Sequence, residues 1–160
     1  MEEIEIIEVL PQLVLGMRQK GVYRDIPAML GELYIYGMSH QGILSGPPVF
    51  ICHEGSVEQA MIANEAGDAD MEVAFPVEGL VEGDGPISTY ELPGGRMVMV
   101  QHRGPYEGCG PTYTRLFAWI EEQGLDITGP VREVYQNDPT QVEPEELLTE
   151  IFVPVSRAGD

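Results

Sequence analysis

Basic residues are scarce in this chain, whose 160 residues include 8 lysines and arginines against 27 aspartates and glutamates. The resulting formal net charge of −19 at pH 7 repels phosphate backbones, so we expect no direct binding to nucleic acid. The same field attracts cations to a cleft, although a solvated acidic surface explains the composition equally well. The charge therefore argues against nucleic acid as a partner and only weakly favours a cationic ligand.

Cysteines and long apolar runs are also few. The chain has two cysteines, and its start, MEEIEIIEVL, lacks the basic and apolar regions of a secretory signal, which favours a reducing cytoplasm. The longest apolar runs, such as MVMV and IFVPV, are far shorter than the roughly 20 residues that a membrane-spanning helix needs. We therefore expect a cytoplasmic protein with no membrane partner.

Patterns that bind metals or nucleotide cofactors are missing as well. His40, His53 and His102 have no ligand spacing, and His53 points to the opposite strand face from its neighbour Cys52. The glycines of GPYEGCGP do not form the G-x-G-x-x-G of a dinucleotide-binding unit. We therefore expect neither a metal nor a cofactor.

Glycine and proline are plentiful, and their positions indicate an internal repeat. Matching positions 83 residues apart are Gly21 and Gly104, Tyr23 and Tyr106, Leu33 and Leu116, and Gly46-Pro47 and Gly129-Pro130. Later, MEVAFPV (71–77) matches TEIFVPV (149–155), so that Glu72 falls on Glu150 and Pro76 on Pro154. The chain therefore consists of two halves with one pattern.

The second half is predicted to run strand, helix, strand, strand. RMVMVQH (96–102) is a strand that Gly104-Pro105 breaks. Apolar residues at Tyr113, Leu116, Phe117 and Ile120 then have the spacing of a helix with one buried face, and Gly124 ends it. REVYQND (132–138) and LLTEIFVPV (147–155) are two further strands, joined by an acidic loop.

The first half repeats this order. LPQLVLGMR (10–18) is a strand, and a helix follows with Asp25 as N-cap and Gly42 as its end. PPVFICHE (47–54) and MEVAFPV (71–77) are strands. We place repeat 1 at about 4–79, an exposed acidic linker at about 80–88 and repeat 2 at about 89–156.

Two such βαββ units cannot each bury both faces of a sheet, so they are expected to pair about a pseudo-twofold axis. The predicted fold class is α+β, with an antiparallel sheet, two main helices and a ligand cleft between the halves.

Two carboxylates are candidates for that cleft, because residues two apart on a strand share a face. Glu133 shares a face with Tyr135, and Glu150 shares one with Phe152. A carboxylate among rings has a raised pKa, accepts hydrogen bonds or binds a cation. An exposed cross-strand pair is the alternative reading, and the sequence leaves open which glutamate is buried.

The second half, from LPGGRMVMVQHRGPYEGCGPTYTRLFAWIEEQGL through GPVREVYQND to LLTEIFVPV, resembles the GyrI-like small-molecule-binding family. This family includes effector-binding domains of AraC- and MerR-type multidrug-responsive regulators. The resemblance implies a tandem βαββ fold that binds drug-like, often cationic aromatic compounds around a buried glutamate. Its glutamate falls on Glu133, and its ring-lined wall draws on Tyr106, Tyr113, Trp119 and Tyr135.

The resemblance also explains the Gly-Pro-Tyr turn. Glycine breaks the strand, proline fixes the entry to the helix, and Tyr106 is then placed at the mouth of the groove, with Tyr23 as its duplicate. Unlike the regulators, this sequence begins with a strand and shows no helix-turn-helix.

The leading hypothesis is therefore a module that senses or sequesters small hydrophobic cations. The first alternative, which the family also implies, is a hydrolase of electrophilic cyclopropane-containing compounds with Glu133 as catalytic base. The second is a gyrase-inhibitor-like protein with a protein partner. The ligand and the oligomeric state stay open.

Overall fold

The computed structural model describes residues 3–40 and 44–157 of the chain. Residues 11–93 form one compact unit, called here the N-terminal unit, and residues 1–10 with 94–160 form the C-terminal unit. These bounds differ from the predicted repeats, because strand β1 (Glu5–Val9) pairs with β6 (Gly95–Arg103) of the later half, and β5 (Ser88–Leu92) pairs with β2 (Gln12–Gly21). Each unit thus takes one edge strand from the other half of the sequence.

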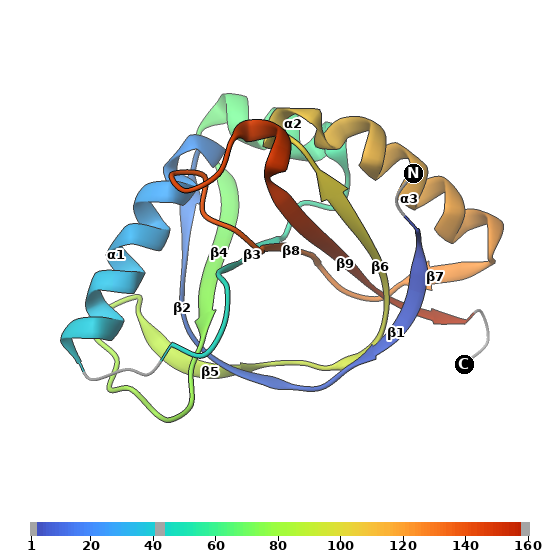
Figure 1. Cartoon of the computed structure of the whole chain (residues 1–160). Helices are drawn as coiled ribbons and strands as arrows, with labels where there is room; N and C mark the ends of the chain where they lie inside the picture. Colours follow the sequence, from blue (N-terminus) through green and yellow to red (C-terminus); the bar gives the residue numbers. More distant parts are fainter. Residues whose placement is uncertain (1–2, 41–43, 158–160) are drawn as a thin grey trace. The chain divides into compact units, whose positions relative to one another are not determined.

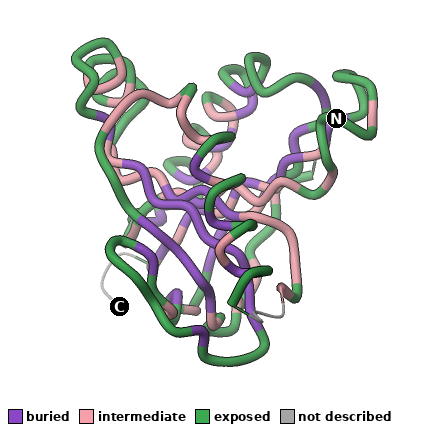
Figure 2. Tube along the Cα trace, turned by 90° about the vertical axis from the view of Figure 1, so that its left-hand side faces the viewer, coloured by how far each residue is buried: buried purple, intermediate pink, exposed green. Residues whose placement is uncertain are grey.

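The N-terminal unit is an antiparallel sheet with strand order β3-β4-β2-β5. Its remaining strands are β3 (Val49–Cys52) and β4 (Ala69–Pro76), and its helices are α1 (Ile26–Ser39) and α2 (Val57–Ala66) with a short 3-10 turn, η1 (Tyr23–Asp25). Helix α1 runs alongside β2 and β4 (Figure 1). The buried positions of the chain lie mainly in the strands (Figure 2), and α2 has none.

Helix α1 starts after the predicted N-cap position, Asp25, but the Asp25 side chain accepts the N–H of Val22 and makes no cap hydrogen bond to the helix. The helix buries Met29, Leu33 and Gly37 along one stripe. A side chain at Gly37 would press on Leu15 of β2, so glycine allows the helix to approach the sheet closely. The predicted helix end, Gly42, lies outside the described residues.

The C-terminal unit is an antiparallel sheet with strand order β1-β6-β9-β8, and β7 (Leu125–Ile127) pairs with the end of β9. Strand β8 covers Val131–Tyr135 and β9 covers Leu148–Arg157. Helix α3 (Cys109–Glu122) follows the 3-10 turn η2 (Tyr106–Gly108), and a second such turn, η3 (Pro144–Glu146), lies in the predicted acidic loop. The predicted strand, helix, strand and strand are present in this order in both units, with an additional helix, α2, between β3 and β4 and an additional short strand, β7, between α3 and β8.

Helix α3 covers one face of its sheet with the predicted stripe. Leu116 and Ile120 are 0% and 2% exposed, and they pack on Val98, Val100, Ile151 and Val153 of β6 and β9. Gly124 adopts a φ of 69°, the left-handed conformation that ends a helix at little cost for glycine.

The repeat is visible in matching contacts. Ser45 donates its backbone N–H to the Pro76 carbonyl at 2.8 Å, and Thr128 donates to the Pro154 carbonyl at 2.9 Å. The glycines that follow, Gly46 and Gly129, each leave room for the ring of the same proline. The sequence alignment of the two halves therefore holds at the level of single hydrogen bonds.

Two features differ from the sequence predictions. Helix α2 was not predicted, because it buries no residue and its apolar side chains leave no buried stripe to recognise. The linker is only partly exposed, since Val81 and Ile87 are buried. No helix in 3–40 and 44–157 combines the length and the apolar character that crossing a bilayer requires.

Candidate functional site

Glu133 of β8 lies at the centre of a cluster of tyrosines. The hydroxyl of Tyr135 donates a hydrogen bond to Glu133 Oε1 at 2.9 Å, and the hydroxyl of Tyr113 donates to Glu133 Oε2. Both oxygens of the carboxylate therefore accept a phenol. All three side chains are half-buried.

Strand register and helix packing bring these residues together. Glu133 is paired with Ile151, and Ile151 with Val100, so the carboxylate lies on the sheet face that α3 covers. Tyr135 is two residues further along β8 and shares this face, and Tyr113 is in the first half of α3. The predicted common face of Glu133 and Tyr135 is thus consistent with the register.

Tyr106 adds a third ring to the cluster. Gly104, at a φ of 122°, turns the chain out of β6 in a conformation that favours glycine. The ring centroid of Tyr106 is 5.4 Å from that of Tyr135, with the planes at 62°. At 37% exposure, Tyr106 is the most accessible ring of the cluster. We call Glu133, Tyr106, Tyr113 and Tyr135 the tyrosine–glutamate cluster.

The charge of Glu133 affects the ionisable groups around it. Burial raises the pKa of Tyr113 and Tyr135 well above the usual range, and the negative charge of Glu133 raises it further. Burial, then Glu133 and Glu107, raise the pKa of the Cys109 thiol to about 12. Cys109 is therefore a protonated neighbour of the cluster and a poor nucleophile at neutral pH.

Glu150 and Phe152 do not join this cluster. Phe152 is paired with Arg132 and Glu150 with Val134, which places both on the opposite face of the sheet from Glu133. Glu150 accepts a hydrogen bond from Gln136. It lines a hollow of about 230 Å³ together with Glu3, Glu5, Met99 and Gln101.

Trp119 and Tyr23, the other two predicted ligand-binding residues, have different surroundings. Trp119 packs against the core between α3 and its sheet. Tyr23 belongs to the N-terminal unit, where its hydroxyl donates to Glu54 Oε1 at 2.5 Å and its ring meets the edge of Phe50 at 6.0 Å. Four of the eight predicted residues therefore form one cluster.

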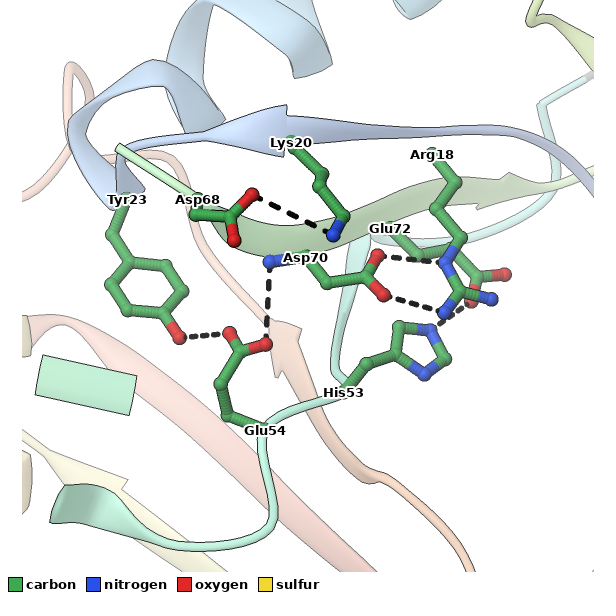
Figure 3. A network of polar contacts seen from close by, with 8 residues as sticks. All are labelled: Arg18, Lys20, Tyr23, His53, Glu54, Asp68, Asp70 and Glu72. Carbon is green, nitrogen blue, oxygen red and sulfur yellow. Dashed lines mark hydrogen bonds and ion pairs between the residues drawn. The ribbon is translucent and has the colours of Figure 1, made fainter. Parts of the chain in front are cut away.

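A second carboxylate, Glu72 of β4, is bound by polar partners in the N-terminal unit (Figure 3). Its Oε1 is 2.7 Å from His53 Nε2, and its Oε2 accepts the hydroxyl of Tyr90 at 2.5 Å. Glu72 is 9% exposed. Arg18, its cross-strand partner on β2, makes a bidentate ion pair with Asp70, with both bonds at 2.7 Å.

The Glu72 network lies on the sheet face away from α1, and Gly16 makes room for it. A Cβ atom at Gly16 would overlap the hydroxyl oxygen of Tyr90, so the tyrosine ring lies directly over bare backbone. Sequence reasoning missed this network, although the alignment of Glu72 with Glu150 marked the position. Gln136 donates to Glu150 as His53 contacts Glu72, which repeats the contact in the other unit.

Neither network has the composition of a metal centre. Within 3–40 and 44–157, no group of three or more histidine, cysteine, aspartate or glutamate side chains could hold a metal ion. What the tyrosine–glutamate cluster offers chemically is a negative charge beside aromatic rings.

Several solved structures share the fold. The C-terminal domain of EcmrR has a TM-score of 0.87 at 20% identity, covering 98% of this chain and 99% of that one. EcmrR in the EcmrR–DNA complex has a TM-score of 0.86 at 20% identity. The match covers 98% of this chain but only 58% of the EcmrR chain.

Two other structures are more distant. A hydrolase encoded by lin2189 from Listeria innocua has a TM-score of 0.67 at 17% identity, covering 96% of this chain and 92% of that one. SAV2435 bound to tetraphenylphosphonium has a TM-score of 0.58 at 16% identity, covering 96% and 98%.

No curated protein is detectably similar in sequence. The model of the GyrI-like small molecule binding domain matches residues 2–156, which is nearly the whole chain. Together with the α+β fold and its repeated units, this match identifies the chain as a member of the GyrI-like small-molecule-binding domain family.

Proposed function

We propose that the protein binds small hydrophobic cations, with Glu133 as the anionic contact and Tyr106, Tyr113 and Tyr135 as the aromatic wall. The observation that carries the proposal is the partnering of Glu133. Its two oxygens accept phenols, and the ion pairs of Arg18, Lys20 and Arg96 are made with other carboxylates. The carboxylate is half-buried, and the two groups that donate to it are neutral hydroxyls.

Such a site favours a delocalised cation. A half-buried carboxylate gains from a positive partner because it has lost part of its hydration. Ring faces attract a cation by about 0.5–2 kcal/mol each, and a flat or greasy cation loses little hydration on entry. The similar fold of SAV2435, described as bound to tetraphenylphosphonium, supports this ligand class.

Titration of the full chain with tetraphenylphosphonium tests the proposal, with Trp119 fluorescence or calorimetry as the readout. Glu133→Gln keeps the size of the side chain and removes its charge, so we expect affinity to fall at least roughly tenfold, or about 1.4 kcal/mol. Glu150→Gln is the matched control, because Glu150 lies on the opposite sheet face. Equal affinity in the wild type and Glu133→Gln would refute the role of Glu133.

The second candidate function is hydrolysis with Glu133 as general base, which is favoured by the similar fold of the Listeria innocua hydrolase. A carboxylate that takes a proton from water contributes about 10²–10⁴-fold to a rate. Multiple turnovers of a reactive cyclopropane-containing substrate, lost in Glu133→Gln and kept in Glu150→Gln, would establish this function. Stoichiometric binding without product would refute hydrolysis and would be consistent with the binding function only.

Whether binding serves sensing or sequestration depends on partners. A domain of this fold lies within EcmrR, which has been observed on DNA. We propose that in this acidic chain any regulatory output passes through a protein partner rather than through direct contact with nucleic acid. Binding to duplex DNA at physiological salt would contradict this part of the proposal.

A further inference from the structure

We propose that His102 is a positioning residue that holds the turn at 104–108, and with it the ring of Tyr106, over the tyrosine–glutamate cluster. The consequence for ligand affinity depends on the proposed function. The consequence for the ring contact does not, and it can be measured in the free protein.

His102 is the second-to-last residue of β6, just before the turn. It is 6% exposed and lies on the sheet face that α3 covers. Across β9 it is paired with Thr149, and Thr149 is paired with Tyr135. His102, Thr149 and Tyr135 therefore form one cross-strand row beneath the turn that carries Tyr106.

Both ring nitrogens of His102 are engaged. Nε2 is 3.0 Å from the carbonyl oxygen of Pro105, and Nδ1 is 2.9 Å from Thr112 Oγ1 in the first turn of α3. A carbonyl oxygen only accepts, so Nε2 carries the hydrogen and donates it. In the neutral ring Nδ1 then accepts from the hydroxyl of Thr112. His102 thus ties β6 to the turn through one nitrogen and to α3 through the other.

Besides the contact with His102, the turn at 104–108 is held by backbone hydrogen bonds. Gly104 donates its N–H to the Leu147 carbonyl at 2.8 Å, and Gly108 donates to the Pro105 carbonyl at 3.0 Å. No hydrogen bond of the Tyr106 hydroxyl is found within the described residues. The place of the ring is therefore set by the turn and by its edge contact with Tyr135.

The equivalent turn of the N-terminal unit shows the contrast. Tyr23 donates its backbone N–H to Asn64 Oδ1 at 2.8 Å and its hydroxyl to Glu54, so the side chain is anchored at both ends. The position that corresponds to His102 is Gln19, which is exposed. The buried anchor, His102, is therefore found in the unit whose turn tyrosine, Tyr106, has no hydroxyl partner among the described residues. We propose that this hydroxyl is available to a ligand.

Two amide substitutions distinguish the hydrogen bond of His102 to Pro105 from its hydrogen bond to Thr112. The amide of His102→Gln reaches about as far as Nε2 and can donate to Pro105, whereas that of His102→Asn reaches only to Nδ1 and can accept from Thr112. The first readout is the nuclear Overhauser contact between Tyr106 and Tyr135 in the ligand-free chain. We expect this contact in the wild type and His102→Gln, and its loss in His102→Asn. His102→Phe, which keeps the ring volume without either hydrogen bond, should also lose it and serves if the asparagine variant does not fold.

The second readout is tetraphenylphosphonium affinity. One ring is worth about 2- to 30-fold in binding a cation, so His102→Asn should weaken binding by that factor and His102→Gln should restore most of it. In a Tyr106→Ala background, His102→Asn should have no further effect, because His102 acts through that ring. A full additional loss there would show a general structural role and overturn the proposal.

The two readouts fail separately. If no cation binds to the wild type, the proposed function falls and the ring contact alone decides the inference. If the Tyr106–Tyr135 contact survives unchanged in both His102→Asn and His102→Phe, the inference is wrong whatever the affinities are.

Discussion

Each unit holds a carboxylate between two hydrogen-bonding partners, but the partners differ in kind. In the N-terminal unit Glu72 contacts His53 and Tyr90, and the guanidinium of Arg18 stands opposite it on β2. The pKa of Arg18 is raised, chiefly by its hydrogen bond to Asp70 and with a further contribution from the charge of Glu72. Glu72 therefore belongs to a network that contains the guanidinium of Arg18.

Glu133 in the C-terminal unit accepts hydrogen bonds from two phenols. These hydroxyls stabilise its charge without neutralising it, and the ion pairs of Arg18, Lys20 and Arg96 are made with other carboxylates. Burial and hydrogen bonding are common to both carboxylates, so they do not by themselves mark a ligand site. We propose that Glu133 differs from Glu72 in having a negative charge that a ligand balances.

The largest expected difference in stability comes from the same substitution at both carboxylates. Glu72→Gln weakens two hydrogen bonds to a charged group and removes the attraction to Arg18, so the free energy of unfolding should fall by about 2–3 kcal/mol. Glu133→Gln also weakens two hydrogen bonds, but it removes the desolvation cost of a half-buried charge, so its net change should stay within about 1 kcal/mol. Denaturant titration of both variants measures the difference. Equal losses would mean that the two carboxylates are equivalent.

A smaller effect is expected from the glycine beneath the Glu72 network. A methyl group at Gly16 would overlap Tyr90 and force it from Glu72, so Gly16→Ala should cost about 1–2 kcal/mol of unfolding free energy. Gly31→Ala is the matched control, because nothing lies within 4 Å of the place that its methyl group would take on α1. That substitution should stabilise the helix by about 0.5–1 kcal/mol. If Gly16→Ala is also neutral or stabilising, Tyr90 is not held as described.

The smallest effect concerns pH. The pKa of Asp70 is lowered from 3.8, chiefly by its hydrogen bond from Arg18. A lowered folded-state pKa adds stability above pH 3.8 that is lost as the pH falls through the folded value. Because Arg18 is 54% exposed, we expect only about 0.5–1 kcal/mol. Asp70→Asn should reduce the free energy of unfolding at pH 7 by this amount and should make its decrease at acid pH less steep. An unchanged decrease at acid pH would mean that other carboxylates cause it.

The sequence predicted the parts of the structure that depend on local periodicity. The stripe of α3 and the common face of Glu133 and Tyr135 follow from spacings of three to four and of two residues. The turn before Tyr106 follows from glycine and proline, whose conformational limits are local.

The features of the two carboxylate networks that were missed depend on long-range pairing. The opposite faces of Glu133 and Glu150 follow from the register of β8 against β9, which no single strand pattern contains. The network at Glu72 needs Tyr90 from β5, a strand that pairs with β2 rather than within the predicted second repeat. Chain periodicity gives the faces of each strand but not which strands meet.

The most direct test of Glu133 as the proposed anionic contact compares two ions of the same shape and opposite sign. Tetraphenylphosphonium and tetraphenylborate should be titrated calorimetrically into the wild type and Glu133→Gln. We predict that the wild type binds the cation at least roughly tenfold more tightly than the anion, and that Glu133→Gln removes most of this preference. Equal binding of the two ions by the wild type, or a preference that Glu133→Gln leaves intact, would contradict the account.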